Sequence, residues 1–330
     1  MIYITKKCFL KKGVAFLLLV TLAFICGIGT IPVNAAEHMN TNNKSSYMET
    51  NKDEAVFVSK NVTTREETFY NIYSNKIAVD ISNESDLATL NNGNIESKVD
   101  SAYFSATTVE NIVSPNSIIG KDERIRINST TTYPYSAICH LTIMWPDGTS
   151  TDGTAWMYWE DIAITAGHCV YSIEHGGWAE SIIVRPGANG SYSPYGYVYA
   201  TTLHTSTKWV DEANWEYDYG VLELSSDIGN STGWFGTSWT IWWLEGTDVT
   251  VTGYSDENYR EMWAMSGEVT NSTTRKVYYE IDTVEGQSGA PVYKSDHTVI
   301  AIHAYGGTSN NSATRITSGL FDYFHSFREE

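Results

Sequence analysis

The stretch DIAIT, residues 161–165, is short, mostly apolar or β-branched, and followed by a turn. Seven similar runs lie between residue 117 and the C-terminus, separated by turns rich in Gly, Asn, Asp and Ser. They are SAICHLTIMW at 136–145, SIIVRPG at 181–187, GVLEL at 220–224, DVTVTGY at 248–254, KVYYEID at 276–282, PVYKS at 291–295 and VIAIH at 299–303. Such runs predict an all-β fold, either a sandwich or a pair of barrels.

The C-terminal tail, SGLFDYFHSFREE at 318–330, has a different period. Four apolar residues recur at the spacing of one helix face: Leu320, Phe321, Phe324 and Phe327. Ser318 precedes them as the expected cap. This spacing predicts a C-terminal helix.

The first 35 residues have the pattern of a signal peptide. Four lysines precede an apolar stretch from Val14 to about Ile31, and Ala35 follows where a signal peptidase would cut. An uncleaved anchor is the alternative. We expect residues 1–35 to be removed and the chain to be secreted without stable membrane association, because no other apolar run is long enough to span a bilayer.

The composition changes near residue 116. Residues 36–116 are rich in Asn, Ser, Thr and Glu and contain no Trp, whereas all 11 Trp lie in residues 117–330. This shift predicts a domain boundary at Ser114-Pro115-Asn116. Residues 36–116 are then either a flexible spacer or a propeptide that keeps the following domain inactive or helps it to fold.

Charge and cysteine content exclude two classes of protein. The formal net charge of −18 leaves no basic surface for nucleic acid. Of the 4 cysteines, Cys8 and Cys26 leave with the predicted signal peptide, and Cys139 and Cys169 are too few for a disulfide scaffold. The fold must therefore depend on a hydrophobic core.

Three turns contain side chains that together can perform nucleophilic chemistry. His168 lies in a turn just after DIAIT, Asp218 lies before the run GVLEL, and Ser288 lies in a glycine-flanked turn in EGQSGAP. Each residue type is common in turns. A serine nucleophile, however, needs a base, a carboxylate that orients the base, and amides aimed at the oxyanion. The chain order His, Asp, Ser is the chymotrypsin order, and Ala290 breaks the G-x-S-x-G motif of α/β-hydrolases.

These motifs resemble a known family. TAGHC, YDYGVLEL and GQSGAPV resemble the chymotrypsin-fold serine proteases, and further pieces narrow the resemblance to the secreted glutamyl endopeptidases of bacilli and staphylococci. Those pieces are SIIGKDERIRI at 117, YPYSAICHLT, AGHCVYS, RPGANGSYSPYG, DVTVTGY, MWAMSGEV and AIHAYGG. The resemblance covers nearly all of residues 117–330. It implies two six-stranded antiparallel β-barrels with the site between them, a monomeric mature enzyme from Ser117, and cleavage of proteins or peptides after acidic residues.

The resemblance also implies a role for each motif residue. Ser288 would attack the scissile carbonyl, His168 would transfer the proton, and Asp218 would orient the imidazole. The amides of Gly286 and Ser288 would form the oxyanion hole. Two other aspartates lie in polar loops and fit the carboxylate role less well: Asp211 and Asp227.

A pocket for an acidic side chain is implied in the same way. In the glutamyl endopeptidases a histidine after the nucleophile binds the substrate carboxylate, with a threonine five residues before the serine and the mature N-terminal amine. The matching positions are His303, Thr283 and Ser117. A bound carboxylate raises the pKa of a histidine, so the ring is cationic in the occupied pocket and close to neutral in the empty one. Without the resemblance, His303 is interpreted as a satisfied core histidine.

Activation is expected to work through this pocket. A cut between Asn116 and Ser117 would create the amine and make residues 36–116 a propeptide. Because Asn116 is not acidic, another protease or a tolerant self-cleavage must make the cut. Gln287 stands where animal trypsin-like enzymes have the aspartate that pairs with their new N-terminus.

Two positions depart from the family pattern. Glu285 stands where glycine is usual, and its carboxylate would repel a glutamate substrate by roughly a few kcal/mol at most. It would weaken the preference for Glu or favour activity at lower pH. Relatives from bacilli bridge the cysteine after the catalytic histidine to a position that is Gly153 here. Cys169 therefore either pairs with Cys139 or both thiols are free.

The predicted function is a secreted serine endopeptidase, made as a zymogen, that cleaves after Glu and less readily after Asp. The alternatives are a related protease whose specificity Glu285 has changed, an inactive protease-like binding module, and a secreted esterase, which the chain order disfavours. The chemistry requires no cofactor and no metal, and no acidic loop has the ligand spacing of a calcium site. The expected partners are acidic substrates and an activating protease.

Overall fold

The computed structural model describes residues 56–71 and 118–328. The predicted signal peptide, most of the predicted propeptide, and Ser117 lie outside the described residues.

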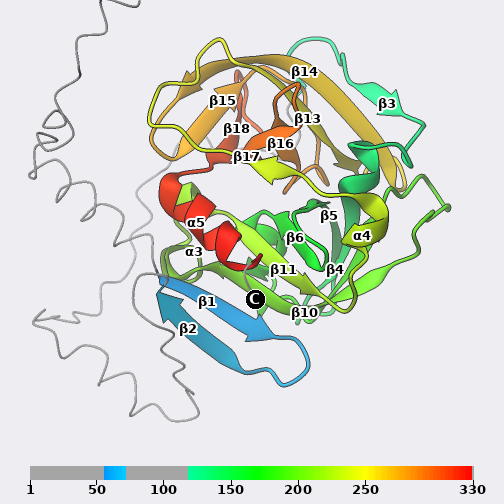
Figure 1. Ribbon diagram of the computed structural model, residues 1–330, viewed down its shortest axis with the longest axis vertical. Helices are drawn as coiled ribbons and strands as arrows, with labels where there is room; N and C mark the ends of the chain where they lie inside the picture. Colours follow the sequence, from blue (N-terminus) through cyan, green and yellow to red (C-terminus); the bar gives the residue numbers. More distant parts are fainter. Residues whose placement is uncertain (1–55, 72–117, 329–330) are drawn as a thin grey trace, which may run out of the picture. The chain divides into compact units, whose positions relative to one another are not determined.

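The first barrel is a closed antiparallel sheet (Figure 1). Its six strands pair in the order β11-β6-β5-β4-β9-β10, and the pairing of β10 with β11 closes the ring. They are β4 (Ile138–Met144), β5 (Ser150–Met157), β6 (Ile162–Thr165), β9 (Ser181–Pro186), β10 (Val198–Ser206) and β11 (Gly220–Leu224). All four residues of β6 are buried, which explains the apolar run DIAIT.

The second barrel is closed in the same way. Its strands pair in the order β16-β13-β14-β15-β18, and β17 joins β16 to β18. They are β13 (Asp248–Ser255), β14 (Glu261–Ser272), β15 (Lys276–Tyr279), β16 (Pro291–Tyr293), β17 (Thr298–Tyr305) and β18 (Asn311–Arg315). Two short strands extend this sheet: β3 (Ile125–Ile127) on β14 and β12 (Gly236–Thr237) on β17.

The remaining elements are short. They are β1 (Val56–Asn61), β2 (Glu67–Asn71), β7 (Tyr171–Ser172), β8 (Gly177–Trp178), η2 (Tyr135–Ala137), η3 (Gly167–Cys169), α3 (Thr207–Glu212), η4 (Trp215–Tyr217), α4 (Gly229–Thr232) and α5 (Ser318–Ser326).

The predicted fold class is confirmed. All eight predicted runs are barrel strands, whereas β5, β10, β14 and β18 were not predicted. The C-terminal helix α5 is also confirmed, with two corrections. Its cap is Thr317 rather than Ser318, because the Thr317 hydroxyl accepts a hydrogen bond from the amide of Leu320 at 3.2 Å. Of the predicted face, Leu320 and Phe324 are buried and Phe321 and Phe327 pack against the core partly buried, whereas the buried Tyr323 was not predicted.

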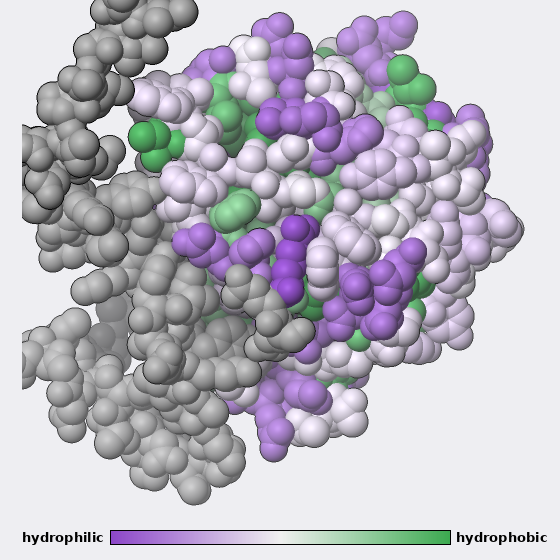
Figure 2. All heavy atoms as spheres, in the orientation of Figure 1, coloured by the Kyte–Doolittle hydropathy of each residue, from purple (hydrophilic) through white to green (hydrophobic). Residues whose placement is uncertain are grey.

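The surface of the described residues is mixed in polarity. In Figure 2 hydrophilic and neutral residues dominate the face in view, and the apolar patches are small and separated. Within residues 56–71 and 118–328, no helix has the length and apolar character to cross a membrane.

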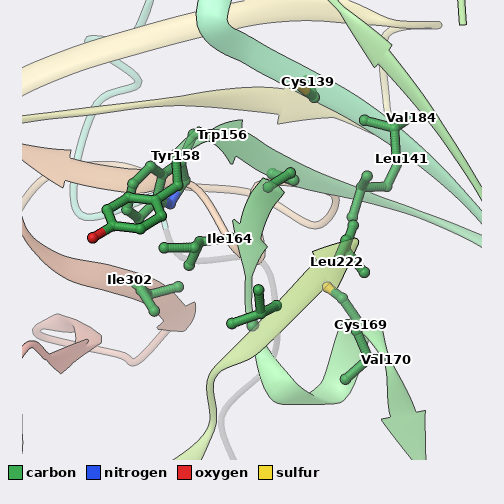
Figure 3. Close-up of a cluster of buried hydrophobic side chains, with 14 of the residues drawn as sticks. Cys139, Leu141, Trp156, Tyr158, Ile164, Cys169, Val170, Val184, Leu222 and Ile302 are labelled. Carbon is green, nitrogen blue, oxygen red and sulfur yellow. The ribbon is translucent and has the colours of Figure 1, made fainter. Parts of the chain in front are cut away.

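The first barrel's core contains both cysteines as free thiols (Figure 3). The Cys139 sulfur lies 3.9 Å from the carbonyl oxygen of Ala137, and the Cys169 sulfur lies 3.7 Å from that of Ser288. Figure 3 shows the two sulfurs in separate parts of the cluster. Of the two alternatives left open by the sequence, the structure therefore has the free thiols. Burial raises the pKa of the Cys139 thiol, which keeps it protonated.

A bridge between positions 153 and 169 is geometrically available. A Cβ on Gly153 would lie 3.2 Å from the Cys169 sulfur, close to the separation of about 3 Å between a Cβ and the partner sulfur in a disulfide. We expect Gly153→Cys to form this bridge under oxidising conditions and to stabilise the fold by about 3 kcal/mol, as for other loops of this length. Thermal unfolding with and without reductant measures the effect, with Gly153→Ser as the unbridged control. Equal melting temperatures for oxidised and reduced Gly153→Cys would contradict the prediction.

Candidate active site

The predicted catalytic residues come from three turns and both barrels. His168 lies in η3 after β6, Asp218 follows η4 before β11, and Ser288 precedes β16. Because β6 and β11 are antiparallel neighbours, with Gly220 opposite Thr165, the turn after β6 and the turn before β11 lie at the same edge of the barrel.

Two hydrogen bonds join Asp218 to His168. The carboxylate oxygen Oδ2 lies 2.7 Å from the imidazole Nδ1, and Oδ1 accepts from the His168 amide at 2.9 Å. Asp218 is fully buried, whereas the His168 side chain is 29% exposed. Burial alone would raise the pKa of Asp218, but His168 reverses this and keeps it below its ordinary value. Burial alone would lower the pKa of His168, but the Asp218 carboxylate raises it well above its ordinary value.

Two residues that sequence analysis did not single out lie near Asp218. The Tyr305 hydroxyl lies close enough to the Asp218 carboxylate to help lower its pKa, and the Tyr305 ring lies 6.0 Å from the His168 ring. Lys276 is fully buried, donates to the Trp215 carbonyl at 3.2 Å, and places Nζ 4.8 Å from the centre of the Tyr305 ring. Burial lowers the pKa of Lys276 to about 8, although the Asp218 carboxylate opposes this shift. The sequence does contain a signal for Lys276, because a lysine begins the otherwise strand-like run KVYYEID.

The nucleophile turn has a backbone that only glycine allows. Gly286 and Gly289 have φ angles of +88° and +89°, in the left-handed region. A Cβ on Gly289 would collide with the carbonyl oxygen of Thr154.

Thr154, on β5 of the first barrel, braces this turn. Its amide donates to the Ser288 carbonyl at 2.9 Å, and its hydroxyl donates to the Gly286 carbonyl at 2.8 Å. The hydroxyl also accepts from the Tyr254 amide at 2.9 Å. A single threonine therefore ties the first barrel to the nucleophile turn of the second, a contact that no sequence motif indicated.

The turn that contains His168 contacts the turn that contains Ser288 through Cys169, whose thiol faces the Ser288 carbonyl. Among the hydrogen bonds of the described residues, none joins the His168 imidazole to the Ser288 hydroxyl. Among the hydrogen bonds of residues 118–328, neither the Gly286 amide nor the Ser288 amide has an acceptor.

The predicted pocket residues His303 and Thr283 are both buried in the second barrel. The His303 Nδ1 lies 2.6 Å from the Tyr279 hydroxyl. Burial, together with the nearby His168 and Lys276, lowers the pKa of His303 to about 3. The backbone of His303 holds the chain just after Ser288: its carbonyl accepts from the Gly289 amide at 2.7 Å, and its amide donates to the Ala290 carbonyl at 2.9 Å. The buried Thr283 hydroxyl has no hydrogen-bond partner among the residues that the structure describes.

The segment after Ser117 is fastened next to Thr283. The buried Asp282 carboxylate accepts from the Ile119 amide at 2.7 Å and from the Glu123 amide at 3.0 Å. Asp282 is a further residue that sequence analysis missed. Ser117 itself lies outside the described residues.

Glu285 is exposed at the rim of the nucleophile turn. Partial burial and the neighbouring Asp256 carboxylate raise its pKa above the ordinary value. The Asp256 amide donates to the Glu285 carbonyl at 3.1 Å, which keeps the two acidic residues adjacent.

The fold and the sequence together define the class. The trypsin family matches residues 148–328, more than half of the chain. The chain therefore belongs to the trypsin family and is a serine endopeptidase with the chymotrypsin fold.

The relatives narrow the class further. A glutamyl endopeptidase of Bacillus licheniformis is 41% identical over 220 residues, which cover 62% of this chain and 67% of that protein. A Bacillus subtilis protein named extracellular metalloprotease is 41% identical over 215 residues, covering 63% and 68%. Among solved structures, a Glu endopeptidase in complex with MPD aligns with a TM-score of 0.58 and 25% identity, covering 64% of this chain and 99% of that one. In the described ranges no group of three or more His, Cys, Asp or Glu is arranged to hold a metal.

Proposed function

We propose that the chain is a secreted glutamyl endopeptidase, made as a zymogen, that cleaves proteins or peptides after Glu and less readily after Asp. The observation that carries the proposal is the pair of buried polar groups beside the nucleophile turn, the His303 ring and the Thr283 hydroxyl. A buried hydroxyl without a partner is costly, and a carboxylate oxygen in the pocket would provide the missing partner. The names of the relatives support the same specificity and an extracellular location.

The proposed mechanism uses the contacts described above. The Ser288 Oγ attacks the scissile carbonyl while His168 Nε2 takes its proton, and Asp218 holds the opposite ring nitrogen and stabilises the charged imidazolium. The amides of Gly286 and Ser288 donate to the developing oxyanion. His168 then protonates the leaving amine, and water hydrolyses the acyl-enzyme by the reverse sequence of proton transfers.

The proposed activation is a cut between Asn116 and Ser117 by another protease or by tolerant self-cleavage. The two hydrogen bonds that the Asp282 carboxylate accepts support it, because they hold the Ile119 amide, two residues after the proposed cut, at the residue that precedes Thr283. The new amine would add a cation to a pocket whose histidine is neutral when empty.

The test compares peptides that differ only in the residue before the cut, Glu, Asp, Gln, Phe or Lys, with residues 117–330 bearing a free Ser117 amine. We expect kcat/KM for Glu to exceed that for Gln by about 100-fold, since a buried carboxylate bond to a cation is worth roughly 3 kcal/mol. Equal turnover of the Glu and Gln peptides would contradict the proposed specificity. A serine-directed inhibitor should abolish activity and a chelator should not, which separates this function from that of a metalloprotease.

Glu285 provides a further prediction. We expect Glu285→Gln to raise kcat/KM for Glu peptides about 3-fold to 10-fold at pH 8, because it removes a negative charge near the substrate carboxylate. The raised pKa of Glu285 means that it is protonated at higher pH than an ordinary glutamate, so the gain should shrink as the pH falls. Glu268→Gln, at an exposed position of β14, is the matched control. An unchanged Glu-to-Gln ratio would show that Glu285 does not reach the substrate.

A further inference from the structure

Part of the predicted propeptide is folded on the protease domain. The strands β1 and β2 form an antiparallel hairpin, and β1 lies along β10 (Figure 1). The register runs from Asn61 opposite Thr202 to Phe57 opposite Ser206, and the Val62 amide donates to the Thr201 carbonyl at 2.8 Å.

The hairpin fills an edge that the barrel leaves open. The neighbouring strand β9 pairs with β10 only at Val198 and Tyr199. Residues 202–205 of β10 therefore have β1 as their partner on that side and β11 on the other, and Ser206 pairs with β1. An unpaired strand edge is a ready template for strand addition.

The first residues of β1 belong to the core of the first barrel. Phe57 and Val58 are each 1% exposed, so successive side chains are buried on both faces of the strand. The Phe57 ring stacks on Tyr323 of α5, with centroids 3.4 Å apart and an interplanar angle of 9°, and lies 6.1 Å from the Tyr219 ring. This packing is inconsistent with a flexible spacer at these positions.

The hairpin also contacts the structure that holds Asp218. Tyr219, which Phe57 contacts, is the next residue in the chain, and its carbonyl accepts from the Thr205 hydroxyl at 2.7 Å. Thr205 in turn lies opposite Val58 in the sheet. The hairpin therefore packs against the residues that position the turn of Asp218.

We infer that the β1–β2 hairpin is a docking element that keeps the N-terminal segment bound to the protease domain after the chain is cut before Ser117. The edge of β10, with Tyr219 and Tyr323, is its binding surface, and residues 56–71 are the occupant. None of these contacts involves residue 116 or 117, so a cut between those two residues breaks none of them. The inference rests on the proposed function only for the position of the cut.

The test uses the full chain with Ser288→Ala and an external-protease site in place of residues 113–116. After the external cut, the N-terminal segment is expected to co-elute with residues 117–330 on gel filtration at about 1 µM, which requires a micromolar or tighter complex. Elution of the segment apart from a folded, soluble 117–330 domain would overturn the inference. Because the nucleophile is absent and the cut is external, this outcome is independent of catalytic activity and of Glu specificity.

A matched pair of variants tests the surface itself. Phe57→Ala is expected to weaken binding of the cut segment by about 30-fold or more, since it removes a fully buried aromatic anchor. Thr63→Ala, at an exposed position of the hairpin turn, should leave binding unchanged. Hydrogen exchange at the amides of residues 202–206 should rise only when the segment leaves. Equal binding of the two variants would overturn the assignment of this surface. Hydrogen exchange at residues 202–206 in the uncut chain gives a second readout of the pairing with β1 and shows whether Phe57→Ala folds.

Discussion

Asp218→Asn is expected to lower kcat by about 10⁴-fold, with a much smaller change in KM. The amide of asparagine can donate to Nδ1, which would hold the imidazole with its proton on Nε2. In that tautomer His168 cannot accept the proton of Ser288. The fold should survive, because the asparagine oxygen can still accept from the His168 amide, a bond of 2.9 Å in the structure.

The control is Asp211→Asn, an exposed position on α3 that sequence analysis considered for the same role. Its kcat should stay within about 2-fold of the unaltered enzyme, as for ordinary surface changes. The pH profile is a second readout. Asp218 raises the pKa of His168, and neutral histidine is the active base, so activity disappears as the pH falls through that raised pKa. Without the carboxylate the pKa falls, and the residual activity should extend to lower pH. A loss of less than 10-fold would contradict the assignment of Asp218 as the carboxylate that orients His168.

Burial explains why one barrel strand escaped prediction. In β18, the sequence NSATR has the composition of a loop, yet all five residues are buried. Asn311 donates to the Ile281 carbonyl at 2.7 Å, and Arg315 donates to the carbonyls of Thr273, Thr240 and Trp242. Buried polar residues are stable when their hydrogen bonds are satisfied. Those partners lie in loops 30 to 75 residues away along the chain, so a local apolar pattern cannot indicate them.

Irregular pairing explains two more of the missed strands. The register of β10 with β11 shifts between Ala200 and Thr202, and that of β14 with β15 shifts between Val269 and Asn271. Such a bulge inserts a residue and breaks the alternation on which sequence-based assignment depends. The regular strand β11, by contrast, coincides with the predicted run GVLEL from its first residue to its last.

In the candidate site, too, some residues were predictable from local sequence and others were not. The turns of His168, Asp218 and Ser288 were predictable because local glycines and short motifs mark them. The residues that support these turns are Thr154, Tyr305 and Lys276, and Asp282 holds the segment at Ile119; each of them contacts residues far away in the sequence. The β1–β2 hairpin was missed for the opposite reason, since its surroundings have the composition of a spacer and only its contacts with β10 and α5 make it part of a core.

His303→Ala is expected to lower kcat/KM for Glu peptides by about 100-fold, while that for matched Gln peptides stays within about 3-fold. The difference arises because a cationic ring binds a carboxylate much more strongly than an amide. The control is His140→Gln, which alters another buried histidine, on β4 of the first barrel. It should leave the Glu-to-Gln ratio unchanged, even if it lowers stability.

The pH dependence of KM separates a carboxylate-binding His303 from a core histidine. In the empty pocket its pKa is lowered to about 3, so the ring is neutral near pH 7. A bound carboxylate raises that pKa, and binding of a Glu peptide then takes up a proton. Proton uptake is favoured at low pH, so KM for Glu peptides should rise with pH while KM for Gln peptides does not. In His303→Ala the two peptides should show the same pH dependence. If the unaltered enzyme already treats them alike, His303 serves only the core, and another group must bind the acidic side chain.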